Sequence, residues 1–273
     1  MPIVTLSRGF PAGCQAVAEA VAASLGCPCV GREILVEAAA KLGVPADILA
    51  SKIGHVPGLW DRLTVERQRY IIAVQAALAE RVVMGDLVYH SYAGHLLLKD
   101  LPCILRVRIV APMEARIQEA MRSENLSRHL AEVSVRQYDE VRGRWTSALY
   151  GLDWSDPTLY DLVLNLEQLS VEESADCIVR VARHPRFAIT EDLRKRLKDF
   201  LLDTRVRLAF EKSPATHGLP VKVTARDGRV VVSVTALETS MPGALHEVFR
   251  GEVMSVLKAV EGVRQVEVKI EPH

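Results

Sequence analysis

The chain has 273 residues, of which 49% are hydrophobic, so it is long and apolar enough for two folded domains with buried cores. Its 34 basic and 34 acidic side chains balance, which argues against nucleic acid or an anionic membrane as the main partner. The sequence has no 18-residue apolar window and no charged leader before an apolar run, so we expect neither a transmembrane segment nor secretion.

The cysteines indicate a reducing compartment. There are five, none of them in a CxxC pair, and an odd number fits a cytoplasmic protein better than a disulfide framework. Cys27 and Cys29 flank a proline but have no second Cys or His cluster to complete a metal site. We therefore predict no metal bound by cysteine.

The first elements are a strand, a turn of small residues and a helix. Ile3 to Leu6 form a short apolar run, and Val17, Val21 and Leu25 recur at helical spacing. Such a turn presents backbone N–H groups at a helix N-terminus, where the helix dipole favours negative charge. The pattern is typical of a phosphate-binding loop, and equally of an ordinary strand-to-helix turn in an α/β domain.

The full phosphate-loop motif would place Lys and Ser or Thr directly after its last glycine. Here Gly13 is followed by Cys14, Gln15 and Ala16. The backbone cradle is therefore expected without its side-chain cation or its magnesium-binding hydroxyl. For Cys14 we favour a packing role over a nucleophilic one, because no His base is evident beside it.

Strands and helices alternate as far as residue 110. We expect strands at 26–30, 87–89 and 104–110, and helices at 32–42, 64–85 and 91–98, with a short helix within 44–57. This alternation predicts a parallel sheet covered by helices on both faces. Ligands bind such sheets at the carboxyl ends of the strands, where the first turn lies.

Residues 113 to 147 form an Arg-rich helical region that carries nearly as many acidic side chains. One interpretation is a solvated helix pair with surface ion pairs, and the other is a lid whose guanidinium groups bind phosphates. A last buried strand is expected at 160–165, with Asp161 and Asn165 in structural hydrogen bonds, and Ser170 should cap a helix over 171–182. Trp60 and Trp154 are candidates for stacking on a base, with packing as the alternative.

The composition changes at residues 184–186, which we take as a domain boundary. A charged helix at 191–210 is followed by β-prone runs at 221–225 and 230–234, separated by Asp227-Gly228, a strong hairpin signal. A helix at 244–260 and an alternating strand at 263–270 complete a small α/β module. We expect two domains, residues 1–183 with a lid at about 113–147, and residues 190–273.

The first domain resembles the cytidylate kinase-like family of P-loop nucleotide kinases. The order and spacing of several short stretches carry this resemblance: Leu6-Ser7-Arg8 with Gly13 and Ala18, Val88 to Leu98, Val107 to Pro112 with Glu114 and Arg116, Asp139 with Arg142, Trp154 to Pro157, and Tyr160 to Asn165. The resemblance implies a P-loop kinase-like parallel sheet with a helical lid. It also implies transfer of the γ-phosphoryl group of ATP to a nucleoside monophosphate with Mg²⁺, a reaction that depends on positioning and charge neutralisation.

The resemblance also implies roles for individual residues. The catalytic lid residues would be Arg116, Arg136, Asp139 and Arg142. Phosphate would be held at the first loop by Ser7, Arg8, Gly9, Ala12, Gly13, Cys14 and Gln15. The acceptor would lie near Arg32, Tyr92 and His95.

The chain departs from the family pattern at three places. The family loop reads Gly-x-Gly-Gly-Arg or carries Lys, whereas Pro11, Cys14, Gln15 and Ala16 stand there in this chain. Gly31 replaces an Asp, and Ser91-Tyr92-Ala93 replaces Gly-Arg-Gly. Two functions follow as hypotheses, a kinase that uses ATP and Mg²⁺, and a non-catalytic sensor of a nucleotide or another small anion.

The second domain resembles a BON domain in its order of helix, Val-x-Val strand, Asp227-Gly228 turn, apolar strand, helix and Gly262-Val263 strand start. That resemblance implies binding of phospholipid or of a small ligand. The alternative is a module that packs on the first domain or forms a homodimer.

Overall fold

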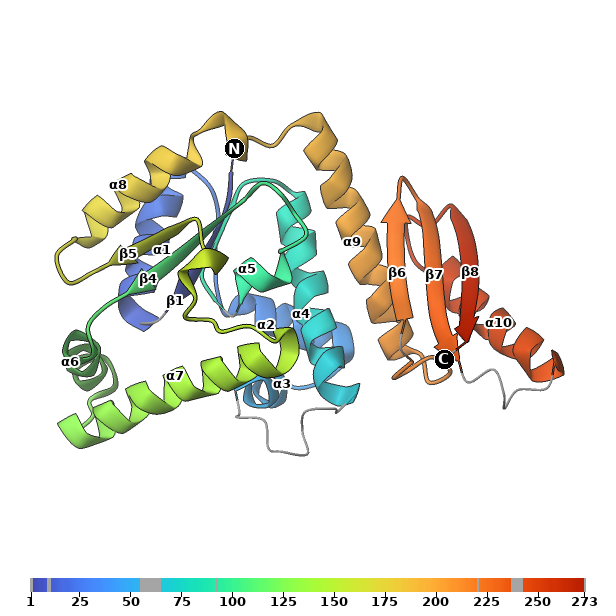
Figure 1. Cartoon of the computed structure of the whole chain (residues 1–273), viewed down its shortest axis with the longest axis horizontal. Coiled ribbons are helices and arrows are strands. Elements are labelled where there is room, and N and C mark those ends of the chain that lie inside the picture. The colour runs from blue at the N-terminus through green and yellow to red at the C-terminus, as the bar shows by residue number, and fades with distance from the viewer. Residues whose placement is uncertain are drawn as a thin grey trace. The chain divides into compact units, whose positions relative to one another are not determined.

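The computed structural model describes residues 2–8, 11–54, 65–91, 93–219, 221–236 and 243–272 (Figure 1). The chain divides into two compact units. The first comprises residues 1–34, 50–64 and 84–189, and the second comprises residues 35–49, 65–83 and 190–273. The second unit thus combines the C-terminal module with two earlier segments, which the sequence grouped with the first domain.

The first unit is built on a five-stranded sheet in the order β2-β3-β1-β4-β5, with every neighbouring pair parallel. The strands are β1 (Ile3–Arg8), β2 (Cys29–Val30), β3 (Leu87–Tyr89), β4 (Ile104–Val110) and β5 (Leu162–Asn165). The predicted parallel sheet is confirmed. β5 was expected to be buried, but it lies at the sheet edge with Val163 43% exposed.

The helices of the first unit follow the predicted alternation. They are α1 (Pro11–Leu25), α5 (Gly94–Leu97), α6 (Met113–Glu124), α7 (Arg128–Tyr150) and α8 (Val171–Ala182), with short 3-10 turns η2 (Pro157–Leu159) and η3 (Pro185–Phe187). α2 (Glu33–Leu42) and α3 (Ala46–Gly54) contain residues of both units. α8 begins at the predicted cap, where Ser170 and Glu173 form a reciprocal capping box.

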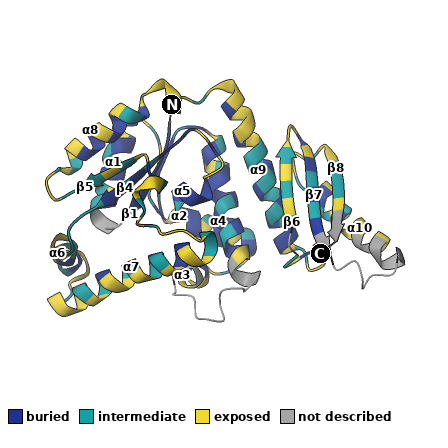
Figure 2. Ribbon diagram, viewed as in Figure 1, coloured by how far each residue is buried: buried dark blue, intermediate teal, exposed yellow. Residues whose placement is uncertain are grey.

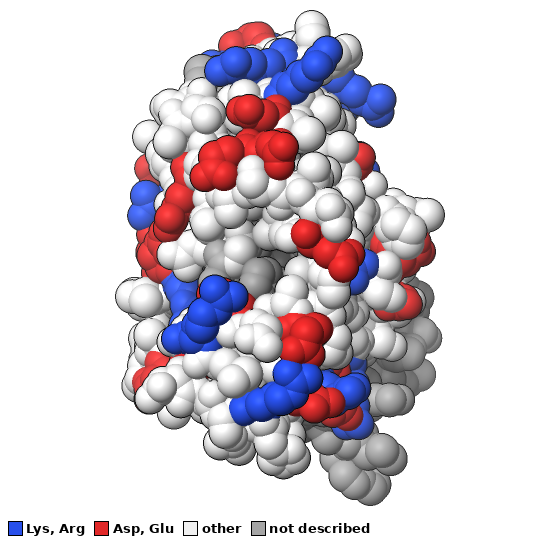
Figure 3. All heavy atoms as spheres, turned by 90° about the vertical axis from the view of Figure 1, so that its left-hand side faces the viewer, with Lys and Arg blue, Asp and Glu red and all other residues white. Residues whose placement is uncertain are grey.

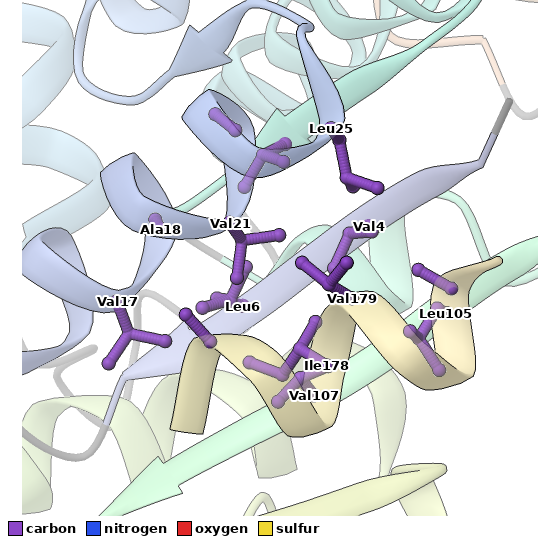
Figure 4. Packing of buried hydrophobic residues seen from close by; sticks show 14 of the residues in the cluster. Val4, Leu6, Val17, Ala18, Val21, Leu25, Leu105, Val107, Ile178 and Val179 are labelled. Carbon is purple, nitrogen blue, oxygen red and sulfur yellow. The ribbon is translucent and has the colours of Figure 1, made fainter. Parts of the chain in front are cut away.

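One face of this sheet packs against α1 and α8 (Figure 4). Val4 and Leu6 of β1 and Val107 of β4 point toward Val21 of α1 and Ile178 of α8 (Figure 4), and all five are at most 1% exposed. Figure 2 shows the burial class of each described residue along the chain. Burial of each such side chain contributes roughly 1.5–3 kcal/mol. Because alternate residues of a strand face opposite ways, Thr5 and Ser7 lie on the other face of the sheet.

The two helices α6 and α7 form the predicted Arg-rich region. They share a small apolar cluster, with Ile117 and Ala120 on α6 and Ala131 and Val135 on α7. On the face of the molecule shown in Figure 3, Lys and Arg side chains lie among Asp and Glu side chains. This mixture agrees with the zero net charge of the chain.

The second unit contains α4 (Val65–Val83), α9 (Glu191–Lys212), α10 (Gly243–Lys258) and a three-stranded sheet in the order β6-β7-β8. β6 (Val221–Arg226) and β7 (Arg229–Ala236) are antiparallel, and β8 (Gln265–Pro272) is parallel to β7. The hairpin prediction is confirmed, because Asp227 and Gly228 both have positive φ, 46° and 78°. Val206 and Phe210 of α9 are buried against Val232 of β7 and Val253 of α10.

α4 belongs to the second unit because it packs along α9. Glu80 on α4 connects two other helices of this unit. It accepts a hydrogen bond from Lys41 of α2 at 2.6 Å and lies 3.9 Å from Arg205 of α9. None of the helices in the described ranges has the length and apolar character needed to cross a membrane.

Candidate functional site

A pocket lies in the first unit at the carboxyl edge of the sheet, where ligands bind parallel α/β folds. It is lined by Ser7, Ala93, His95, Val141, Arg142, Trp145, Thr146 and Trp154. These residues come from β1, from the turn after β3 with α5, from α7, and from the loop that follows α7. The pocket is therefore closed on one side by the second helix of the Arg-rich region.

The turn after β3 has a strained backbone that places α5 close to the sheet. Ala93 has the left-handed φ of 44°, which side chains other than glycine adopt at a cost. Gly94 follows, and a Cβ atom there would lie 2.5 Å from Cδ1 of Tyr89. Only glycine allows this approach, and the approach brings His95 over the sheet.

His95 is a buried, neutral imidazole in the pocket. It is 5% exposed, and its ring lies 4.7 Å from that of Tyr160. Burial, followed by repulsion from Arg142, Arg106 and Arg108, lowers the pKa of His95 to about 3. Neither ring nitrogen has a hydrogen-bond partner among the described residues.

Arg106 is held by one carboxylate. Its side chain donates to Asp161 at 3.1 Å from Nε and 2.9 Å from a terminal nitrogen, and its backbone N–H donates to the same carboxylate at 2.9 Å. Burial raises the pKa of Asp161, but these bonds outweigh it and lower the pKa overall. The predicted structural role of Asp161 is confirmed, as is that of Asn165, whose side chain accepts a bond from the Glu167 N–H at 3.1 Å.

Arg108 lies between aromatic rings. Its guanidinium carbon is 4.5 Å from the centroid of the Trp154 ring and 5.7 Å from that of Tyr160, and it donates to the Ser155 carbonyl. Tyr160 donates its own hydroxyl to the Trp154 carbonyl at 2.9 Å, with Ser7 Oγ at 3.4 Å. These bonds hold the Tyr160 ring in position beside the Arg108 side chain.

Of the four predicted lid residues, Arg142 is the one that lines the pocket. It is 9% exposed, and its guanidinium carbon lies 4.5 Å from the Tyr138 ring and 5.8 Å from the Trp154 ring. Arg116 instead pairs with Asp139 at 2.7 and 2.6 Å, a bidentate ion pair that joins α6 to α7. Arg136, with its side chain 64% exposed, pairs with Glu132 one turn away.

The start of α1 differs from the predicted loop. The helix already begins at Pro11, a residue favoured in the first turn, so Ala12 and Gly13 are helical rather than part of an open loop. Cys14 is fully buried in the core, as predicted for a packing residue, and Gln15 donates to Glu19 at 2.9 Å.

The other predicted binding residues are divided between the pocket and its surroundings. Ser7 and His95 line the pocket. Arg8 is the last residue of β1, and Arg32 is exposed just before α2 and does not line the pocket. Gly9 and Tyr92 lie outside the described residues.

The side chains at the start of α1 do not fit a bound magnesium ion, which takes oxygen ligands. Cys14 and Gln15 stand where the motif would supply a cation and a hydroxyl, and Asp139 and Asp161 are already bonded to arginines. Within the described ranges, no group of three or more His, Cys, Asp or Glu residues could hold a metal ion.

The sequence matches the Cytidylate kinase-like family over residues 3–168, more than half of the chain. The chain belongs to this family. The P-loop kinase-like fold expected from the sequence is thus confirmed for the first unit, whereas the BON-like domain falls outside the matched residues and stays a prediction.

Two relatives show how far the similarity reaches. The cytidylate kinase of Staphylothermus marinus is 27% identical over 109 residues, 39% of this chain and 60% of that protein. The cytidylate kinase of Methanosarcina acetivorans is 34% identical over 101 residues, 36% of this chain and 54% of that protein. This cytidylate kinase-like chain thus spans between half and two thirds of the length of these curated relatives.

The solved structures that superpose on this chain are similar to it in fold alone. An uncharacterized protein from Eubacterium ventriosum superposes with a TM-score of 0.50 at 19% identity, covering 66% of this chain and 97% of its own. A gluconokinase from Sinorhizobium meliloti superposes with a TM-score of 0.42 at 16% identity, covering 68% of this chain and 96% of its own.

The sequence did not single out Arg106, Arg108 or Trp145 as site residues. The signal for the two arginines was present, because they interrupt an apolar strand at alternate positions and therefore share one face of the sheet. Trp145 lies on α7, and its Nε1 is buried without a hydrogen-bond partner among the described residues. No periodicity distinguishes it from a core residue.

Proposed function

We propose that this protein binds a nucleoside monophosphate in the pocket under α7 and acts as a nucleotide sensor without the turnover of a P-loop kinase. The observation that carries the proposal is the convergence of Arg142 and Arg108 on the ring of Trp154, beside the neutral His95. Guanidinium groups such as those of Arg108 and Arg142 bind phosphate. The Trp154 ring can stack on a nucleotide base, and the His95 nitrogens can form hydrogen bonds to it.

The same structure argues against fast phosphoryl transfer. A P-loop kinase directs a cation at the transferred group, and the removal of one such donor typically costs about 100-fold or more in rate. The position of the family's arginine is held by Gln15, which is bonded to Glu19. Arg116 and Arg136 are paired with carboxylates, so two of the three expected lid arginines already have an ion-pair partner within the protein.

The second candidate is an ATP- and Mg²⁺-dependent nucleoside monophosphate kinase. Family membership and the placement of Arg142 at the pocket favour it. In either case the C-terminal module would carry the response, as a BON-like ligand-binding domain or as a contact for a homodimer.

Calorimetry with ATP and CMP, separately and together with Mg²⁺, followed by an assay of ADP release, separates the two functions. The proposal expects CMP binding with no ADP release above background. ADP release that requires both nucleotides would establish the kinase. If neither ATP nor CMP binds, both functions are wrong.

A substitution at the start of α1 can supply the Lys or Arg side chain that the first loop lacks. Cys14 is buried in the core, so a lysine there would be forced into apolar surroundings, whereas Gln15 is exposed. An arginine at position 15 would pair with Glu19 one turn away, so the informative variant is Q15R combined with E19Q. E19Q alone is the control, and a rise in ADP release only in the double variant would show that the loop is an eroded phosphate site.

A further inference from the structure

The strand register places one arginine beside Ser7, near the carboxyl end of β1. In the parallel pairing of β1 with β4, Ser7 lies opposite Arg108, and Thr5 lies opposite Arg106. These four residues share the sheet face turned away from the core of α1 and α8. Ser7 is followed only by Arg8 before the loop begins, so Arg108 stands at the sheet edge where a P-loop would hold phosphate.

The two strand arginines differ in their partners. Arg106 is neutralised by Asp161 through the bonds described above. Arg108 has no ion pair at contact distance among the described residues. It donates to the Ser155 carbonyl, and its Nε is buried without a hydrogen-bond partner. The nearby Asp153 is itself bonded to the Ser155 backbone N–H and hydroxyl, and Arg108 contributes to the lowered pKa of Asp153.

The rings around Arg108 prepare it for an anion. Trp154 and Tyr160 lie against the guanidinium group and limit its rotation, and a planar guanidinium held in this way loses little entropy when it binds phosphate. Arg142 reaches the same Trp154 ring from α7. Two guanidinium groups from different elements therefore meet at one ring.

A second observation points to a ligand at the same place. His95 lines the pocket, is 5% exposed, and has no partner for either nitrogen among the described residues. Buried polar side chains are nearly always hydrogen-bonded in folded proteins. An imidazole left in this state beside two guanidinium groups is expected to bond to a ligand.

We infer that Arg108, together with Arg142, binds the phosphate of a nucleoside monophosphate at the edge of the sheet beside Ser7. The inference rests on the proposed function, because it assigns a phosphate subsite beside that pocket: Arg108 does not itself line the pocket but contacts Trp154, which does. It places the main positive charge on the sheet rather than at the start of α1.

The experiment compares CMP with cytidine, which lacks the phosphate, on the full chain by calorimetry. The variants are R108Q, which removes the charge, and R108K, which keeps the charge without the planar fork. R128Q is the matched control, because Arg128 is also an arginine of the first unit, but it is exposed at the start of α7, is paired with Glu114 and does not line the pocket. Tryptophan fluorescence of each variant checks that the first unit remains folded.

We expect R108Q to weaken CMP binding by about 10- to 100-fold, the effect of losing a charge-assisted hydrogen bond, and to leave cytidine binding unchanged. R108K should fall between R108Q and the wild type, and R128Q should bind both ligands as the wild type does. If the wild type binds CMP and R108Q binds it equally well, the inference is wrong while the proposed function stands. If the wild type binds neither ligand, the proposed function itself fails. If R108Q does not fold, R108K tests the inference instead, because a folded R108K must also bind CMP more weakly than the wild type.

Discussion

Replacement of His95 by glutamine should remove a pH dependence of stability that the fold creates. In the unfolded chain the imidazole has its ordinary pKa of 6.5, whereas burial and three arginines lower the pKa to about 3 in the folded protein. A lowered histidine pKa means that the unfolded state binds more protons between these values, so stability falls as the pH falls below 6.5. At pH 5.0 the loss due to His95 amounts to about 2 kcal/mol relative to pH 8, because each pH unit below 6.5 contributes about 1.36 kcal/mol.

Urea unfolding of the wild type and of H95Q, followed by tryptophan fluorescence at pH 8.0 and pH 5.0, measures the contribution of His95 to the free energy of unfolding at each pH. Trp145 and Trp154 belong to the first unit and report its unfolding. The other histidines are present in both proteins, so their contributions cancel in the comparison. The wild type should lose about 2 kcal/mol more than H95Q between the two pH values. An equal loss in both proteins would show that His95 is protonated in the folded state, and the argument for a neutral imidazole at the pocket would fail.

Two further changes test how the pocket is held. G94A should lower the free energy of unfolding by about 1–3 kcal/mol in urea titrations, because the new Cβ would lie 2.5 Å from Tyr89. G143A on α7, whose Cβ would lie at an ordinary contact distance of 3.6 Å from Nε1 of Trp154, should instead raise the free energy of unfolding by about 0.5–1 kcal/mol, and a loss there would contradict the packing described. D139N should cost about 1–3 kcal/mol by leaving Arg116, whose side chain is 11% exposed, without its carboxylate. A double-mutant cycle with R116Q checks this, and additive effects would show that the pair does not join α6 to α7.

Much of the fold could be predicted because its signals are local. The strands at 87–89 and 104–110 have the predicted bounds, since short apolar runs define them, the second interrupted only by Arg106 and Arg108. Asp227-Gly228 specifies its hairpin because both residues accept a positive φ. The assignment of α4 to the second unit was not predictable, because it depends on packing against α9, more than one hundred residues later in the sequence.

The site was harder to predict than the fold, because a guanidinium group acts according to its partner. Arg116, Arg136 and Arg142 looked equivalent in the sequence, as arginines of one charged helical region. In the structure Arg116 faces Asp139, Arg136 faces Glu132 and Arg142 faces aromatic rings. Only the tertiary arrangement assigns these partners, since an acidic residue lies within one or two helical turns of each of them.

The energetics of Arg108 favour a ligand-binding role over a purely structural one. A guanidinium group that is partly removed from water loses hydration, and a ring contact returns only about 0.5–2 kcal/mol. Replacement of such a charge by an apolar side chain of similar volume is often neutral or stabilising, so packing alone does not require arginine at this position. Arg106, two residues earlier on the same face, forms an ion pair with a carboxylate. Arg108 instead donates to a carbonyl and contacts two aromatic rings. A charge that the fold positions without neutralising it is suited to an anion from solution, and the register with Ser7 puts that anion at the edge of the sheet where a cytidylate kinase-like fold would bind it.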